Sequence, residues 1–169
     1  RKKTILTARY IRPARPSASA TFAPVVVFHG YNWNSLTVTS SLKYALSPHV
    51  SRILSDIPFL CHFRRAVELS TDSPYCEISH YFRVHDPLHA TEGQVYGTLS
   101  YFDCCNLVER IRGECLLSVG LEDVICPPST IFAAYNRIRA PKEIRVYPDF
   151  GHSGSSRHED EKVAFLAKG

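Results

Sequence analysis

Two side chains in the second half of the chain, Asp123 and His152, could together carry out proton-transfer chemistry. Asp123 follows a short apolar run, 116–119, whose lack of alternation is typical of a parallel strand covered on both faces. His152 follows a second predicted strand, which holds Ile144, Val146 and Tyr147, and then a turn. Because ligand and catalytic groups collect at the carboxyl ends of parallel strands, the two side chains should share one edge of a sheet. Their order, acid first and histidine second, matches the last two members of a Ser–Asp–His triad.

The segment between the two runs predicts the helix that joins them. Pro127 and Pro128 disfavour a helix before that point, and Ser129 is a plausible N-cap. Pro141 is predicted to stop the helix. The residues expected on its buried face recur at helical spacing and are Ile131, Phe132, Tyr135 and Ile138.

Each of the two side chains also has an interpretation without chemistry. Asp123 could cap its own loop, and His152 could be a turn histidine packed on Tyr147 or Phe150. A chain with 16 acids and 8 histidines offers many such residues. Spacing alone therefore leaves both interpretations open.

Longer stretches around these residues resemble one known family. SVGLEDVICPPSTIFAAYN at 118–136, followed by PKEIRVYPDFGH at 141–152, is similar to the C-terminal part of the acetyl xylan esterase and cephalosporin C deacetylase family, carbohydrate esterase family seven. SDIPFLCHFRRAVEL at 55–69 and TLSYFDCCNL at 98–107 resemble it too, and the resemblance runs almost continuously from about Leu36 to the end. It implies a truncated α/β-hydrolase fold, with a mostly parallel sheet, flanking helices and a small helical cap.

The resemblance also implies an activity and roles for residues. Members are serine carboxylic-ester hydrolases that remove acetyl groups from acetylated xylo-oligosaccharides, other small sugars or cephalosporin C through an acyl-enzyme, without a metal or another cofactor. Asp123 and His152 would be the catalytic acid and base, and the backbone N–H of Tyr31, in a loop at 28–32 that resembles the family's, would contribute to the oxyanion hole. The family usually has an acid directly after the histidine, where this chain has Ser153.

The sequence does not supply the nucleophile in its usual form. The family places it in a G-x-S-x-G turn, and no serine here has glycines two residues before and after it. Ser153 comes nearest, but Ser155 stands where the second glycine should be. Asn34 leads directly into a stretch that resembles the helix after this turn, so the nucleophile segment is expected to be absent. Ser35 is a candidate nucleophile, although an N-cap is the commoner role for a serine at a helix start.

Three interpretations of function remain open, and one of them, a basic nucleic-acid-binding module, rests on the N-terminal charge alone. The chain could represent an acetyl esterase through an incomplete sequence, as the missing methionine also suggests. It could instead be a catalytically inactive, truncated relative that acts only as a folded or oligomerising domain. The family resemblance implies a small acetylated carbohydrate or related ester as substrate and a homo-oligomer as assembly.

Composition and charge predict an ordinary globular chain. With 44% hydrophobic and 21% charged residues, 1–169 is expected to form a single partial domain, in which 1–34 holds N-terminal strands and the oxyanion loop and 35–169 holds the acid and the histidine. The longest apolar run, 25–28, is too short to span a membrane. The basic residues of 1–15 favour a solvated edge strand over a nucleic-acid surface, which would need clustered charge and aromatic rings on a folded face.

Cysteine and histidine spacings give no metal site. The six cysteines lack C-x-x-C spacing, which predicts buried free thiols in a reducing compartment, the cytoplasm. The histidines of the middle region are predicted to be solvated or packed rather than ligands, and they are His62, His80, His85 and His89.

The remaining elements are predicted from periodicity. A strand is expected at 50–54, followed by two helices, one at 59–67 and one from Pro74, that form a cap over the sheet edge. A helix is expected to continue from 96 to 111. The last helix begins near Glu159, with acids in its first turn, and its predicted buried residues are Val163, Phe165 and Leu166.

Overall fold

The computed structural model describes residues 50–72, 74–153 and 156–167. These residues belong to the compact unit Thr39–Gly169. The predicted strand at 25–28, the candidate oxyanion residue Tyr31 and the candidate nucleophile Ser35 all lie outside the described residues.

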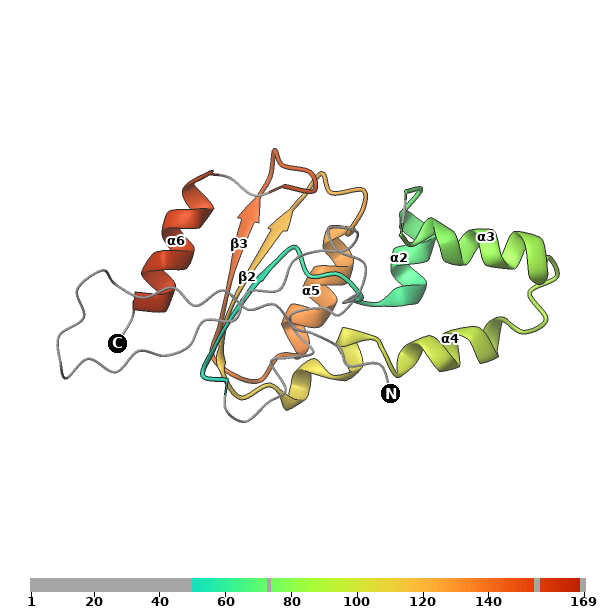
Figure 1. Ribbon diagram of the computed structural model, residues 1–169, viewed down its shortest axis with the longest axis horizontal. Coiled ribbons are helices and arrows are strands. Elements are labelled where there is room, and N and C mark those ends of the chain that lie inside the picture. The colour runs from blue at the N-terminus through green and yellow to red at the C-terminus, as the bar shows by residue number, and fades with distance from the viewer. Residues whose placement is uncertain (1–49, 73, 154–155, 168–169) are drawn as a thin grey trace, which may run out of the picture. The chain divides into compact units, whose positions relative to one another are not determined.

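A parallel sheet of three strands forms the centre of the described unit, in the order β1-β2-β3 (Figure 1). The strands are β1 (Arg52–Asp56), β2 (Glu114–Gly120) and β3 (Lys142–Tyr147), and all pair in parallel. The central strand β2 is buried along nearly its whole length, as its uniform apolar run predicts. The structure confirms the α/β fold class and the strands predicted at 50–54, 116–119 and 144–147.

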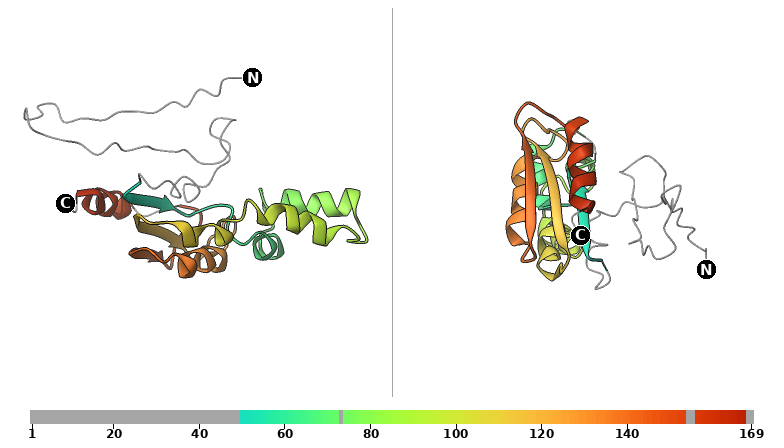
Figure 2. Two further views of the ribbon diagram at one scale, coloured as in Figure 1. Left: turned by 90° about the horizontal axis from the view of Figure 1, so that it is seen from below. Right: turned by 90° about the vertical axis from the view of Figure 1, so that its left-hand side faces the viewer.

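Two helices cover the opposite faces of this sheet (Figure 2). Helix α5 (Pro128–Arg137) connects β2 to β3, the crossover that two neighbouring parallel strands require. Helix α6 (Ser156–Ala167) lies on the other face. The sheet is thus enclosed between two helical layers in the part that carries Asp123 and His152.

The prediction of Ser129 as the N-cap of α5 is wrong. The helix begins at Pro128, its N-cap is Pro127, and no side chain caps it. Proline suits the first helical position because its φ is already near the helical value and it has no N–H to satisfy there. The predicted inner face is confirmed at Ile131 and Ile138, which are buried.

Three helices, α2 (Phe63–Leu69), α3 (Cys76–His85) and α4 (Glu92–Ser100), lie together at one side of the sheet (Figure 1). The helices predicted at 59–67 and from Pro74 are present, but they begin later, at Phe63 and at Cys76. Phe63 and Ala66 are the buried residues of α2, and Phe82 is the buried residue of α3.

The prediction of one continuous helix from 96 to 111 is wrong. Helix α4 ends at Ser100, and two short 3-10 helices follow at Cys104–Asn106 and Val108–Arg110. Asp103 interrupts the helix because its carboxylate accepts hydrogen bonds from the backbone N–H of Cys105 and, across the fold, from the N–H of His62 at 2.8 Å and of Phe63 at 2.9 Å. This buried carboxylate ties the 3-10 segment to the start of α2.

The buried thiols behave as small hydrophobic side chains. All six cysteines are free, and all except Cys76 are buried. Burial raises the pKa of the Cys115 thiol to about 12, so this thiol stays protonated and unreactive at neutral pH. The five buried cysteines therefore fill the core, as the sequence predicts for free thiols.

Helix α6 contacts the sheet through fewer apolar residues than its sequence predicts. Phe165 is buried, but Val163 is 68% exposed, so its predicted burial is wrong. Helix α6 also contacts the sheet through polar groups, since His158 and Lys162 reach Asp56 and Glu161 pairs with Arg145. Its spacing places Val163 on the outer face, which an apolar residue can occupy singly at little cost.

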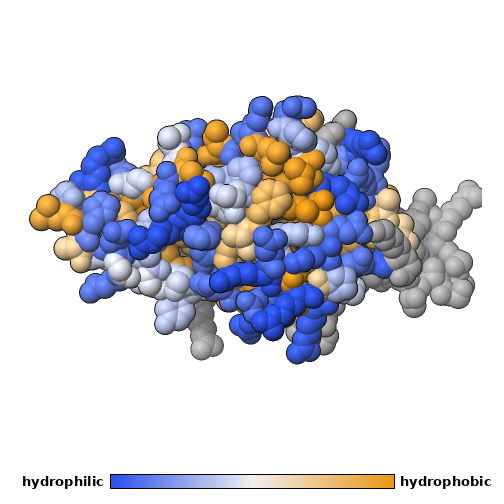
Figure 3. Space-filling view, turned by 180° about the vertical axis from the view of Figure 1, so that it is seen from behind, coloured by the Kyte–Doolittle hydropathy of each residue, from blue (hydrophilic) through white to orange (hydrophobic). Residues whose placement is uncertain are grey.

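The surface of the described unit is mixed in character. On the face drawn in Figure 3, hydrophobic residues are interspersed with hydrophilic ones. In the part of the chain that the structure describes, every helix is too short or too polar to cross a membrane.

Gly120, at the end of β2, lies where the loop that carries His152 packs closely against the end of this strand. A Cβ atom there would lie 2.3 Å from the carbonyl oxygen of Phe150 and 2.4 Å from that of Gly151, both of which are backbone atoms. We expect Gly120→Ala to lower the free energy of unfolding by about 1–3 kcal/mol, because the added methyl group forces these loops apart. Urea unfolding followed by circular dichroism measures the change.

Gly97→Ala is the matched control, since a Cβ atom at this exposed position of α4 meets nothing within 4 Å. It should raise the free energy of unfolding by about 0.5–1 kcal/mol through helix propensity. Equal stabilities of Gly120→Ala and the unsubstituted chain would contradict the close packing of the two loops.

Candidate active site

The structure brings Asp123 and His152 together at the carboxyl edge of the sheet. Asp123 lies in the loop after β2 and His152 in the loop after β3, and the last residues of these strands, Gly120 and Tyr147, are paired neighbours. Nδ1 of His152 lies 2.9 Å from Oδ2 of Asp123, within hydrogen-bond distance. The juxtaposition that the strand order predicts is therefore present.

The Asp123 carboxylate is fixed by its own loop. Its side chain has no exposed surface, and Oδ1 accepts the backbone N–H groups of Ile125 and Cys126, each at 2.8 Å. This leaves Oδ2 to face the His152 ring. Asp123 therefore both caps its own loop and pairs with His152, because Oδ1 accepts the loop N–H groups and Oδ2 faces the histidine.

The loop that carries His152 is held against the Asp123 loop by backbone hydrogen bonds. Leu121 donates its N–H to the carbonyl of Tyr147, and Glu122 donates to the carbonyl of Phe150, each at 3.0 Å. The rings of Tyr147 and Phe150 pack against one another at 5.7 Å between centroids. The ladder of the sheet therefore extends past the strand ends into both loops.

The His152 ring is partly open to solvent and electrostatically coupled to the acid. Its side chain is 43% exposed. The hydrogen bond to Asp123 raises the pKa of His152, against the opposing effect of partial burial. With Nδ1–H donating to the carboxylate, the neutral ring keeps its lone pair on Nε2, the atom that a general base uses.

A thiol lies beside this pair. Asp123, Cys126 and His152 each present a potential metal-ligand atom, and these atoms all lie within 4.8 Å of one another. Burial, and next the negative charge of Asp123, raise the pKa of the Cys126 thiol, so it stays protonated and is a poor ligand. The arrangement suits a histidine base oriented by the acid better than it suits metal binding.

A second polar cluster near this edge was missed by sequence reasoning. His158, only 2% exposed, places Nε2 at 2.7 Å from Oδ1 of Asp56 and Nδ1 at 2.9 Å from the hydroxyl of Tyr147. Lys162 donates to Oδ2 of Asp56 at 2.7 Å. Burial alone would raise the pKa of Asp56, but the hydrogen bonds from Lys162 and His158 outweigh it and lower that pKa. The sequence held no signal of this cluster, because its members come from three separate elements.

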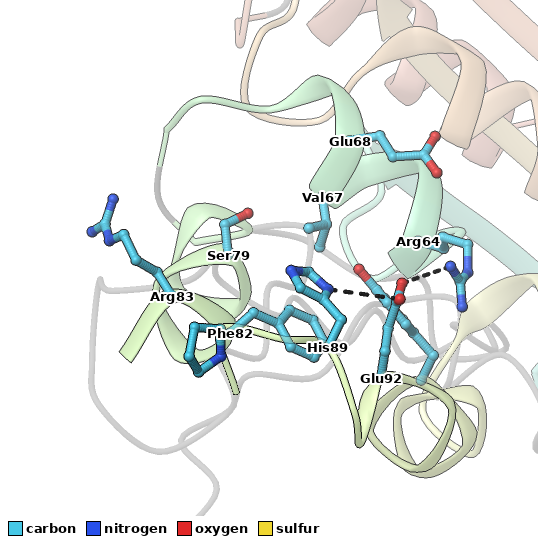
Figure 4. Close-up of a pocket in the computed structure, with 10 residues that line it drawn as sticks. Arg64, Val67, Glu68, Ser79, Phe82, Arg83, His89 and Glu92 are labelled. Atoms are coloured by element: carbon cyan, nitrogen blue, oxygen red, sulfur yellow. Dashed lines mark hydrogen bonds and ion pairs between the residues drawn. The ribbon is translucent and has the colours of Figure 1, made fainter. Parts of the chain in front are cut away.

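A pocket of about 470 Å³ lies among α2, α3 and α4, apart from the acid and the histidine (Figure 4). His89 stacks on Phe82 at 4.8 Å and faces Glu92 at 3.6 Å, while Arg64 donates to the same carboxylate at 2.7 Å. These groups are already paired with one another, as the packed interpretation of His89 predicts. Neither Asp123 nor His152 lines this pocket.

Comparison with known proteins links this arrangement to one family. A family model described as acetyl xylan esterase (AXE1) matches residues 44–169. The chain is 47% identical to an acetyl xylan esterase from Paenibacillus sp. R4, with a TM-score of 0.72, and 43% identical to acetyl xylan esterase 1 from Thermoanaerobacterium sp. JW/SL YS485, with a TM-score of 0.71. Each match covers 75% of this chain and 40% of that structure.

A curated relative is also similar over a shorter stretch. Acetyl esterase Axe7A from Xylanibacter ruminicola is 32% identical over 71 residues, which is 42% of this chain and 16% of that protein. The chain therefore spans less than half the length of each of these relatives.

The pairing of His152 with Asp123 predicts a measurable titration. Asp123→Asn should lower the pKa of His152, because the neutral amide no longer stabilises the imidazolium while it can still accept the loop N–H groups. Titration of the His152 ring protons by NMR measures this shift. Because the folded-state pKa is raised, the stabilisation from this pair is present below the unfolded pKa and is lost as pH rises through the folded value.

Asp149→Asn is the matched control, since it removes an exposed acid from the same loop. Its effect on the His152 titration should be small. A His152 titration that is the same in Asp123→Asn and in the unsubstituted chain would show that the hydrogen bond has no electrostatic consequence.

Proposed function

The chain belongs to the acetyl xylan esterase family, and we propose that it supplies the acid and the base of an acetyl ester hydrolase. The observation that carries the proposal is the 2.9 Å pairing of His152 Nδ1 with Asp123 Oδ2 at the carboxyl edge of a parallel sheet. The half-open His152 ring supports it, because a general base must be reachable by the group whose proton it removes.

The proposed mechanism is acyl transfer through an acyl-enzyme. His152 Nε2 takes the proton of a serine hydroxyl as that oxygen attacks the acetyl carbonyl, and then gives it to the leaving sugar alcohol. Asp123 holds the ring in the required tautomer and stabilises the imidazolium. His152 then activates the water that releases acetate. The backbone N–H of Tyr31 is the proposed oxyanion donor.

The proposed substrates are acetyl esters of small carbohydrates. Acetylated xylo-oligosaccharides are favoured by the names of the two similar structures, both acetyl xylan esterases. The name of the curated relative, an acetyl esterase, supports the same class of bond. Other acetylated sugars and cephalosporin C complete the proposed range.

The identity of the nucleophile decides between two functions. Ser35 is the proposed candidate within this chain, at the predicted start of a helix. The alternative is an inactive, truncated relative that acts as a folded or oligomerising domain. The observation that favours the alternative is the lack of a G-x-S-x-G sequence.

Assembly and location form further parts of the proposal. A homo-oligomer would cover apolar side chains that are exposed along α3 and just after it, namely Tyr81, Val84 and Leu88. The free thiols support a reducing compartment, and we propose the cytoplasm.

An ester-hydrolysis assay tests the function. With a chromogenic acetate ester, the chain should give a burst followed by turnover, and His152→Ala should lower kcat by about 10³-fold or more, because the serine loses its base. His85→Ala, which removes an exposed histidine from α3, is the control and should leave turnover unchanged. Labelling with a fluorophosphonate and mapping the labelled peptide identifies the nucleophile.

Each outcome has a definite meaning. A labelled Ser35, with the label lost in Ser35→Ala, supports the complete triad. An unsubstituted chain that shows no burst and takes no label supports the inactive relative instead. Equal turnover in His152→Ala and the unsubstituted chain overturns the role of His152.

A further inference from the structure

The strand before the loop that carries His152 and the helix after it are joined by a contact between two side chains. Tyr147 is the last residue of β3 and His158 lies in the first turn of α6. The Tyr147 hydroxyl lies 2.9 Å from His158 Nδ1, and the two rings meet edge to face at 5.6 Å. With Asp56, whose Oδ1 lies 2.7 Å from His158 Nε2, these residues form what we call the loop clasp.

The clasp is buried and specific in its hydrogen bonding. His158 is 2% exposed, and both of its ring nitrogens have partners. With Nε2–H donating to the Asp56 carboxylate, Nδ1 accepts the hydrogen of the Tyr147 hydroxyl. A buried ring that is satisfied at both ends has one orientation, so it fixes the Tyr147 side chain as well.

Contacts continue from the clasp to the acid–histidine pair. The Tyr147 ring packs on Phe150, two residues before His152, at 5.7 Å. The carbonyl of Phe150 accepts the N–H of Glu122, which is the neighbour of Asp123. Every link in this path is a direct contact, and it joins the clasp to both loops of the pair.

Helix α6 is also held by contacts outside the clasp. Arg52 donates to the carbonyl of Leu166 at 2.7 Å, Arg145 pairs with Glu161, and Phe165 is buried. Lys162 also reaches Asp56, through Oδ2. The Tyr147–His158 contact differs from these because it involves Tyr147, the residue from which the loop that carries His152 starts.

We propose that His158 is a positioning residue, which acts through Tyr147 to hold the His152 loop at the distance where the ring meets Asp123. The inference rests on the proposed function, since it assigns a purpose to the clasp only if the His152–Asp123 pair is used. His158 does not touch the reacting atoms in this proposal. Its effect is to keep the general base aligned, and a misplacement of about 1 Å can cost about 100-fold in rate.

Two substitutions in the full chain test the clasp. Tyr147→Phe removes only the hydroxyl and keeps the ring that packs on Phe150. His158→Gln keeps a donor for Asp56 but cannot also accept the Tyr147 hydroxyl in the same place. Lys162→Gln is the matched control, because it removes a different hydrogen bond to the same Asp56 and leaves the clasp intact.

The first readout is the NMR titration of His152, which needs no turnover. Tyr147→Phe and His158→Gln should both lower the pKa of His152 toward its ordinary value, because the hydrogen bond to Asp123 that raises it becomes longer. Lys162→Gln should leave it unchanged. If His158→Gln does not fold, the His152 titration in Tyr147→Phe, which removes only a hydroxyl group, tests the proposal on its own.

The second readout is the hydrolysis of a chromogenic acetate ester. Both clasp variants should lower kcat by about 10-fold with KM unchanged, because alignment of the base acts on the chemical step. An unchanged His152 titration in Tyr147→Phe overturns the clasp, whatever the turnover. If the unsubstituted chain shows no turnover but the His152 titration still shifts in the clasp variants, the positioning role of the clasp is supported. The proposed function is then rejected instead.

Discussion

The parallel pairing of β2 with β3 is the constraint on which the candidate site depends. It sets Gly120 beside Tyr147, so that the loops after both strands leave the sheet at the same edge. The backbone hydrogen bonds continue one step further, from Leu121 to Tyr147 and from Glu122 to Phe150. Because Gly120 has no side chain, the backbone of the histidine loop can lie directly against the strand end. An acid and a histidine 29 residues apart therefore meet at 2.9 Å.

This scaffold is rigid where the proposed chemistry needs it. The Asp123 carboxylate is buried and accepts two backbone N–H groups, so only one oxygen faces the histidine. The His152 ring is less buried, as a group that exchanges protons with other molecules must be. The protonated thiol of Cys126 beside them fills space without adding charge. A fixed Asp123 carboxylate paired with a solvent-accessible His152 ring is the geometry that acyl transfer uses.

Sequence reasoning found the parts of this arrangement that local pattern controls. The apolar run around Leu117 predicts a buried parallel strand, and strand order alone predicts that Asp123 and His152 share an edge. Sequence reasoning failed where contacts between residues far apart in the chain determine the local structure. The helix predicted to reach 111 is interrupted at Asp103, whose backbone is extended and whose carboxylate accepts the N–H groups of His62 and Phe63, some 40 positions earlier, which no local pattern records. His158 likewise sits in a polar stretch of sequence but is buried by partners from two strands. Tyr31 and Ser35 lie outside the described residues, so their roles stay proposals.

The central claim is that the neutral His152 ring carries its proton on Nδ1 and donates a hydrogen bond from there to Asp123. This leaves the lone pair of Nε2 free to act as the base. Nitrogen-15 NMR of the His152 ring at a pH above its titration reports directly which nitrogen holds the proton in the neutral form. The account predicts the tautomer protonated at Nδ1, with that proton shifted downfield by the hydrogen bond to the carboxylate. A ring protonated at Nε2, with Nδ1 bare, would contradict it.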